Sequence, residues 1–225
     1  MATRIGLIAE GPIDRALLDP LLSRIADEKV GFTWPVDADD MSTLFPIRKR
    51  GHGGVLKAVQ ALVRVLDEQF LDFAFFVIVL DRRTRPVQEA IRRHIAGKEH
   101  RFVVGVAIEE IEAWWLADRT NTLAWAGLSP ADLPAQCAYA RSRYRAERDP
   151  TPKNTLDEIT RISDRLDRYY GHGSVDLAVE FGEEYWRNGA RLDDMCGQCP
   201  NGFHPFQRRA VNAFRRGRAA SGRLL

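Results

Sequence analysis

Each of three apolar stretches in this sequence ends on an acidic residue. In chain order the pairs are residues 3–9 with Glu10, residues 73–80 with Asp81, and residues 101–108 with Glu109 and Glu110. If the stretches are parallel strands of an open α/β sheet, their carboxyl ends lie at one edge, where such sheets bind ligands. Carboxylates gathered at one edge repel each other unless a cation neutralises them, and hard oxygen ligands suit Mg²⁺, Mn²⁺ or Ca²⁺. The residue types therefore predict a shared site for a divalent cation.

Each acid also has an ordinary structural explanation. Glu10 or Asp14 could cap the helix that follows the first strand, and Asp81 could form a turn. Asp14 stands one helical turn after Glu10, so the two side chains share a face and could serve one ion or two. Three strand-end acids together favour the cation site over three unrelated caps and turns.

The elements that would carry these acids alternate between strand and helix. The predicted strands are residues 3–9, 31–36, 73–80 and 101–108, and the predicted helices follow Gly11 and span about 55–70, 87–95 and 154–166. The run at 73–80 is apolar on both faces, as expected for a strand that helices cover on both sides. Pro20 predicts a kink or a break in the first helix. The pattern favours an α/β core with a mainly parallel sheet over residues 1–118 and an extension of short helices over 119–225.

Composition bounds the class of protein and its compartment. The 225 residues are 45% hydrophobic, which is enough for a buried core, and the formal net charge is +2. Three cysteines predict no disulfide framework, the N-terminus has no signal-peptide pattern, and the longest apolar run is too short to cross a bilayer. We therefore expect a cytoplasmic protein with no membrane partner. The last eighteen residues hold six arginines and no acid, which is typical of a solvated end or of a phosphate-binding arm.

The segment LIAEGPIDRALLDPLL at 7–22 resembles the first motif of the toprim fold, which topoisomerases, DnaG-type primases and OLD-type nucleases share. That resemblance implies a Rossmann-like sheet in which Glu10 ends the first strand. The segment FFVIVLDRRTRP fits the position of the second motif, an Asp-x-Asp, although Arg83 stands in place of the second aspartate. In OLD-like toprims Asp14 would be a further acid, and a later lysine would correspond to Lys153.

A narrower resemblance covers most of the chain. The segments EAWWLAD at 112–118, Pro152–Lys153 and CPNGF at 199–203 are similar to signatures of an uncharacterised bacterial toprim-like family. Its relatives often stand beside ATPases in defence or mobile-element loci. The resemblance therefore implies an ATPase partner.

Together these features predict a Mg²⁺- or Mn²⁺-dependent nuclease that cleaves phosphodiesters of DNA or RNA. Glu10 would act as general acid or base or bind the metal directly, and Lys153 would neutralise the scissile phosphate. The other metal ligands would be Asp14, Asp81, Glu109 and Glu112. Basic residues of two loops would grip the nucleic-acid backbone, namely Arg48, Lys49, Arg50, His52, Arg82, Arg83 and Arg85. The alternative is a toprim-like module that lacks catalysis and binds a partner protein or nucleic acid, because Arg83 brings positive charge to the cation site.

Two other motifs invite a functional interpretation. Cys196, Cys199 and His204 resemble part of a zinc site, but one Cys-x-x-Cys lacks the four ligands of structural zinc, so packed thiols are favoured. The adjacent Trp114 and Trp115 cannot face the same way on a helix. One of them is expected in the core, and the other against the C-terminal portion or a partner.

Overall fold

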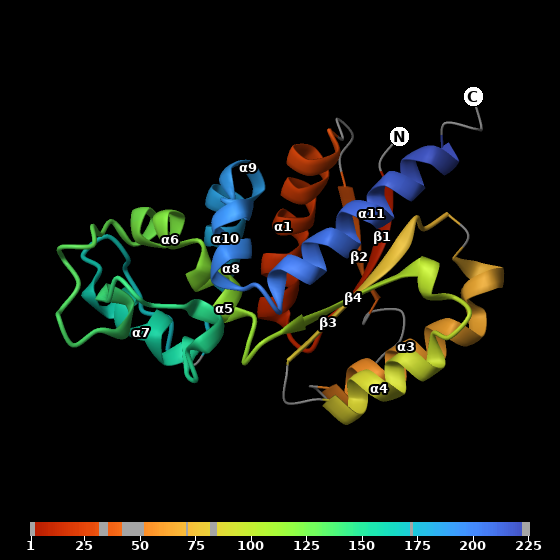
Figure 1. The fold of residues 1–225 in the computed structure, drawn as a ribbon, viewed down its shortest axis with the longest axis horizontal. Helices are drawn as coiled ribbons and strands as arrows, with labels where there is room; N and C mark the ends of the chain where they lie inside the picture. The colour runs from red at the N-terminus through yellow and green to blue at the C-terminus, as the bar shows by residue number, and fades with distance from the viewer. Residues whose placement is uncertain are drawn as a thin grey trace.

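The apolar segment FFVIVLD forms the central strand β3 (Phe75–Asp81), and it is buried along almost its whole length. Parallel neighbours flank it on both sides, β1 (Thr3–Ile8) and β4 (Phe102–Ala107), and β2 (Val36–Asp40) pairs with the outer side of β1. The computed structural model describes residues 3–31, 36–41, 52–70, 72–81, 85–171 and 173–221. Its four-stranded sheet is entirely parallel and has the order β2-β1-β3-β4 (Figure 1). The expected α/β class is confirmed.

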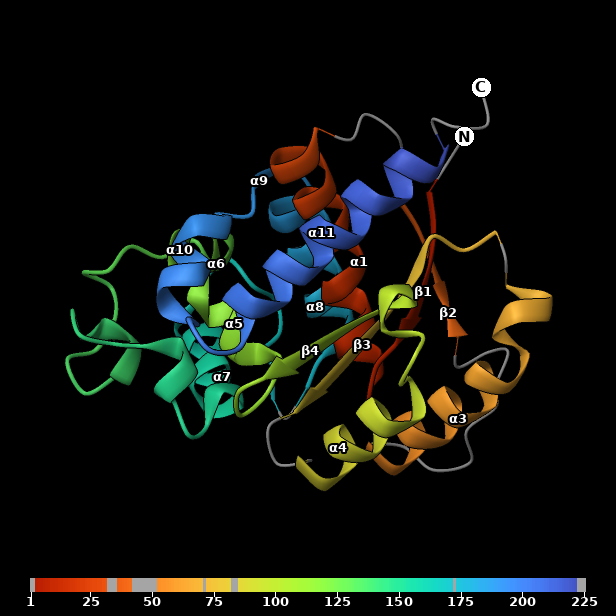
Figure 2. The same ribbon diagram turned by 45° about the vertical axis from the view of Figure 1, so that its right-hand side comes forward.

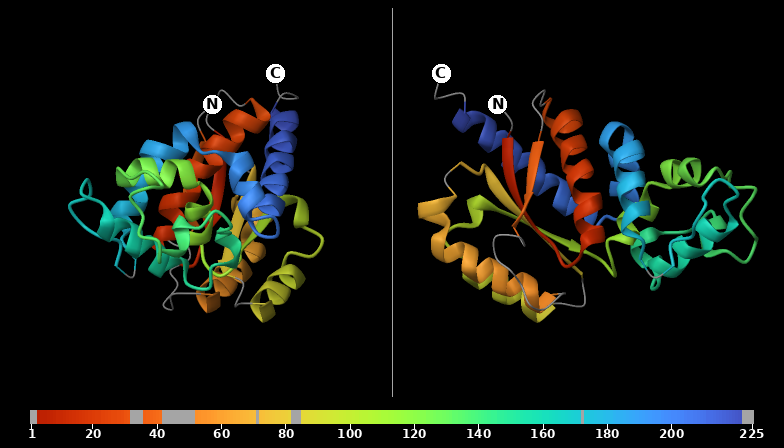
Figure 3. Two further views of the ribbon diagram at one scale, coloured as in Figure 1. Left: turned by 60° about the vertical axis from the view of Figure 1, so that its left-hand side comes forward. Right: turned by 180° about the vertical axis from the view of Figure 1, so that it is seen from behind.

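Helices cover both faces of this sheet. Figure 3 shows α1 (Pro12–Val30) and α11 (Phe203–Ser221) on one face, and α3 (His52–Gln69) with α4 (Arg85–His94) on the other. The alternation of β3 explains the two layers, because Phe75, Val77 and Val79 join the core under α1 and α11. Phe76, Ile78 and Leu80 join a second cluster under α3 and α4.

The C-terminal portion is helical and lies beyond the carboxyl ends of β3 and β4 (Figure 2). Its elements in chain order are α5 (Glu112–Ala117), α6 (Arg119–Ala126), α7 (Pro152–Ile162), α8 (Val175–Phe181), a π-helical turn (Gly182–Trp186), α9 (Arg187–Gly189) and α10 (Leu192–Gln198). Short 3₁₀ turns occupy Glu99–Arg101, Ala138–Ala140 and Ala146–Arg148. One hydrophobic cluster joins this portion to the sheet, since it contains residues of β1, β3, α1, α5, α8 and α11.

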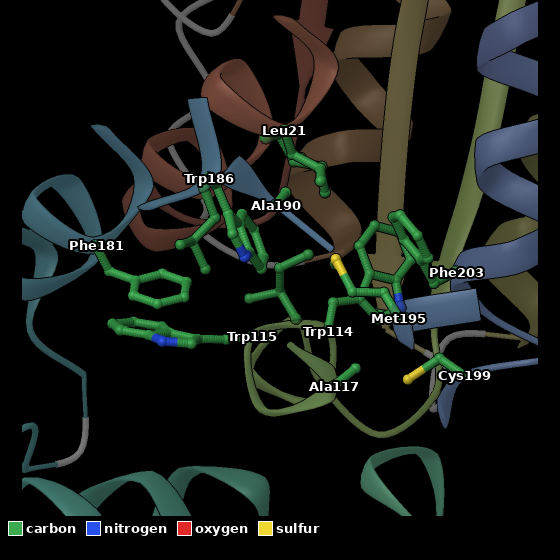
Figure 4. Packing of buried hydrophobic residues seen from close by; sticks show 14 of the residues in the cluster. Leu21, Trp114, Trp115, Ala117, Phe181, Trp186, Ala190, Met195, Cys199 and Phe203 are labelled. Carbon is green, nitrogen blue, oxygen red and sulfur yellow. The ribbon is translucent and has the colours of Figure 1, made fainter. Parts of the chain in front are cut away.

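The two adjacent tryptophans anchor α5 in opposite directions. The Trp114 ring packs on Phe203 and Phe206 of α11, with centroids 5.4 and 5.0 Å away. The Trp115 ring stacks on Phe181, with centroids 4.6 Å apart (Figure 4). Both tryptophans are fully buried. Of the two places expected for the second tryptophan, the C-terminal portion or a partner, the structure shows the C-terminal portion, whose helices cover both rings.

Three expectations about the elements need correction. The second strand begins at Val36 and not at 31, because Gly31 ends α1 in the left-handed conformation with φ 65°; residues 32–35 lie outside the described residues. Helix α1 runs through Pro20, with buried leucines on either side of it, so the expected division of the helix is wrong, while the expected kink stays a prediction. The last helix is not short: α11 has 19 residues, because its apolar face packs along the sheet.

No helix in the described part of the chain combines the length and the apolar character that a membrane span requires.

Candidate functional site

The order of the strands creates a switch point between β1 and β3. From β1 the chain passes to β2 on one side and then to β3 on the other, and in such sheets ligands bind at the carboxyl ends beside this point. Glu10 follows β1, and Asp81 is the last residue of β3. The Glu10 Oε1 atom accepts a hydrogen bond from the Asp81 backbone N–H at 3.1 Å, across the switch point. The structure thus brings together two of the predicted site residues.

Asp14 occupies the first turn of α1, and it serves as a cap as well as a member of the site. Its Oδ2 atom accepts a hydrogen bond from the Gly11 N–H at 2.7 Å, which closes the start of the helix. Burial raises the pKa of Asp14 to about 7, and the negative charges of Glu112 and Glu10 add to the rise. The cap is therefore present, and the role of Asp14 as a metal ligand stays a prediction.

Asp81 lies at the centre of the acidic group. Burial raises the pKa of its carboxyl group to about 8, and the charges of four other carboxylates contribute, those of Glu10, Asp14, Glu112 and Glu110. A carboxyl group with such a pKa is largely protonated at neutral pH, because ionisation would add charge to a site that is already negative. Excess negative charge is the property that a bound cation would relieve.

The C-terminal portion supplies the positive charge of the site. Lys153 is at the start of α7, and its Nζ atom lies 3.1 Å from Glu110 Oε1 and 3.9 Å from Glu112 Oε1. Burial lowers the pKa of Lys153, but the carboxylates of Glu112, Glu110 and Asp81 outweigh it and raise the pKa overall. Lys153 is therefore a cation held beside the acidic group.

Glu112 is the most buried acid of this group, with 1% of its surface exposed. Burial raises its pKa, and Lys153 and Tyr170 partly offset the effect. The Tyr170 hydroxyl donates a hydrogen bond to Glu112 Oε1 at 2.5 Å. The sequence did not reveal Tyr170, because it belongs to a loop without periodicity, 58 residues further along the chain.

Glu109 was predicted as a metal ligand, and it has an unusual backbone. It is the one described residue other than glycine with a positive φ, at 68°. Its charge is not among the main contributions to the raised pKa of Asp81, whereas that of Glu110 is. The backbone at 109 thus turns the chain between β4 and α5, and Glu110 takes the place next to Lys153.

The loop residues predicted to grip nucleic acid fall almost entirely outside the described part of the chain. This applies to Arg48, Lys49, Arg50, Arg82 and Arg83 and to the side chains of His52 and Arg85. Of the cysteines, Cys199 points its thiol at the Ala113 carbonyl and Cys196 contacts Gln207, and burial raises the pKa of the Cys196 thiol to about 11. Both contacts are those of packed thiols.

The donor set suits a hard divalent cation by its chemistry, since carboxylate oxygens dominate it. Over the described ranges, however, no three acidic, cysteine or histidine side chains stand close enough together to hold a metal ion as they are. The carboxylates act on each other through their charges, and Glu10 reaches the end of β3. The residue types are therefore those that bind a hard cation. Their side chains would have to rotate toward one another to coordinate it.

These features define an α/β protein with an acidic, lysine-bearing site at a topological switch point. Comparison of the chain with protein-family models, with curated proteins and with solved structures gives no match.

Proposed function

We propose that this protein is a toprim-like phosphodiesterase that uses Mg²⁺ or Mn²⁺ to cleave nucleic acid. The observation that carries the proposal is the hydrogen bond between Glu10 and the end of β3, which joins two strand-end acids across the switch point. The resemblance of residues 7–22 to the first toprim motif supports it. The ATPase partner that the resemblance implies belongs to the same proposal.

The contacts of the acidic residues and of Lys153 indicate which part of the proposed reaction each would serve. Asp81 and Asp14 would hold the cation, which supplies Lewis-acid stabilisation of a phosphate oxygen when bound. Glu10 keeps one oxygen on the Asp81 N–H, and its other oxygen can accept a proton from an attacking water. Lys153 would balance negative charge on the scissile phosphate, at the cost of its contact with Glu110.

A metal titration followed by thermal melting tests the proposal. A cation at ten times its Kd stabilises the folded state by about 1.4 kcal/mol, which corresponds to about 3 °C for a chain of this length. We expect this rise with Mg²⁺ or Mn²⁺ for the wild type, its loss in Asp81→Asn, which removes one of the two proposed ligands, and its retention in Glu68→Gln. Glu68 is the matched control because it is an exposed glutamate on α3.

Cleavage assays on DNA and on RNA complete the test, with Glu10→Gln as the variant of the proposed base and Glu68→Gln as its control. Metal-dependent cleavage that Glu10→Gln abolishes and Glu68→Gln retains is the expected result. The absence of a melting shift at millimolar Mg²⁺ and Mn²⁺ would contradict the metalloenzyme. A melting shift without cleavage of either substrate would favour the alternative, a binding module without catalysis.

A further inference from the structure

A second feature of the molecule lies along the outer edge of the sheet. Strand β4 is the last strand in the sheet order, and α4 and α11 flank it on the two faces (Figure 2). Two arginines of α11 reach back to the backbone of this edge. Arg209 donates to the Val104 carbonyl at 2.7 Å, and Arg216 donates to the His100 carbonyl at 3.3 Å. They are seven residues apart, so they share one face of the helix.

A third arginine joins them from the other face of the sheet. Burial lowers the pKa of Arg209, and the positive charge of Arg92 on α4 lowers it further. Arg92 on α4 and Arg209 on α11 are therefore close enough for their positive charges to act on each other. We call Arg92, Arg209 and Arg216 the basic strip. All three are exposed.

Among the described residues, no acidic side chain forms an ion pair with an arginine of the basic strip. A carbonyl acceptor leaves the full charge on a guanidinium. Arginines elsewhere do pair with carboxylates, such as Arg161 with Asp157 and Arg168 with Asp176. After Asp194 the sequence contains no further acidic residue, so α11 offers the strip none. Uncompensated cations held in place are the feature that recognises a polyanion.

The basic strip leads toward the acidic site. Helix α11 runs antiparallel to β4, since Gly202 at its start lies against the Val106 carbonyl and Arg216 lies at His100 before the strand. Arg209 and Arg216 are about 10 Å apart along the helix, which matches about three phosphates of one nucleic-acid strand. The distance along β4 from Val104 to the end of the strand is about another 10 Å. A phosphate backbone on the strip would continue to the carboxylates at the switch point.

An anionic membrane is the other polyanion that such a surface could meet. An interfacial helix needs an apolar face that is free to enter the bilayer. The apolar residues of α11 are already buried against the sheet, among them Phe206, Ala210 and Phe214. We propose that the basic strip binds the phosphate backbone of a nucleic acid and leads it to the site. The choice of nucleic acid rests on the proposed function.

A DNA-binding measurement tests this proposal. The probe is a fluorescein-labelled 24-base-pair duplex, and its anisotropy is followed in EDTA over a range of NaCl concentrations. Each lost phosphate contact lowers the slope of log K against log salt by about 0.9. For Arg209→Gln/Arg216→Gln we expect a slope lower by about 2 and an affinity at 100 mM salt lower by about tenfold or more. The control Arg161→Gln/Arg168→Gln removes the same charge from similarly exposed arginines and should stay within about twofold of the wild type.

Arg92→Gln is the second variant. It removes one charge of the strip and no hydrogen bond among the described residues, and an unchanged melting temperature checks that the variant is folded. We expect a slope lower by about 1. Failure of the wild type to bind, an unchanged slope, or equal losses in the strip and control variants would overturn the proposal. Binding to phosphatidylserine vesicles in place of DNA would assign the strip to membranes. Because EDTA prevents metal-dependent cleavage, a missing catalytic activity leaves this result unaffected.

Discussion

Replacement of Asp81 by asparagine should make the protein more stable at neutral and mildly alkaline pH. The pKa of Asp81 is about 8 in the folded protein, because burial and the neighbouring carboxylates oppose its ionisation. In the unfolded chain an aspartate has a pKa of about 3.9. Between these values the folded state holds one proton more than the unfolded state. The free energy of unfolding therefore falls as the pH rises, and the penalty is complete only above the folded pKa.

The magnitude follows from that one proton. Its contribution lowers the free energy of unfolding by about 1.4 kcal/mol for each pH unit, or about 2.7 kcal/mol between pH 5 and pH 7. Water access to Asp81 and its coupling to Asp14 make this decrease smaller. We therefore expect the free energy of unfolding to fall by about 1–2 kcal/mol between pH 5 and pH 7. For 225 residues that corresponds to a decrease in melting temperature of about 2–4 °C. Asparagine has the same shape and does not ionise, so the variant lacks this decrease.

The assay is thermal melting at pH 5, 6, 7 and 8, in EDTA and at constant ionic strength. Asp167→Asn is the matched control, because Asp167 is an exposed aspartate of the C-terminal portion. We expect the difference between Asp81→Asn and the wild type to grow with pH, and the control to follow the wild type. Parallel profiles for the wild type and Asp81→Asn would refute the argument that Asp81 ionises against a cluster of like charges.

Two further predictions concern the packing that positions the site. Gly6→Ala should lower the free energy of unfolding by about 1–3 kcal/mol, measured by urea denaturation, because its Cβ would lie 2.3 Å from the buried Phe76 ring. Glu147→Gln should destabilise by about 2–3 kcal/mol, since this buried carboxylate accepts hydrogen bonds from both backbone N–H groups of Asn201–Gly202. A melting temperature equal to that of the wild type in either variant would contradict the corresponding contact.

Local pattern was enough to predict the elements of the core. The apolar run at 73–80 identified the central strand, because a strand covered on both faces needs continuous apolar residues. The strand-end positions of Glu10 and Asp81 were also visible, since the sequence shows where each apolar run stops. The second strand was misplaced, because three of its five residues, VDADD, are acidic and its pairing with β1 decides its place.

The sequence by itself determined which residue types stand at the ends of the strands. Only the tertiary structure decided which of them meet. Glu10 contacts the end of β3 because β1 and β3 are neighbours in the sheet, and sheet order depends on long-range packing. Tyr170 and Lys153 reach Glu112 because the C-terminal helices fold back over the carboxyl ends of the strands. The pairing of Arg209 with the edge of β4 has the same origin, since a contact 105 residues apart leaves no local pattern.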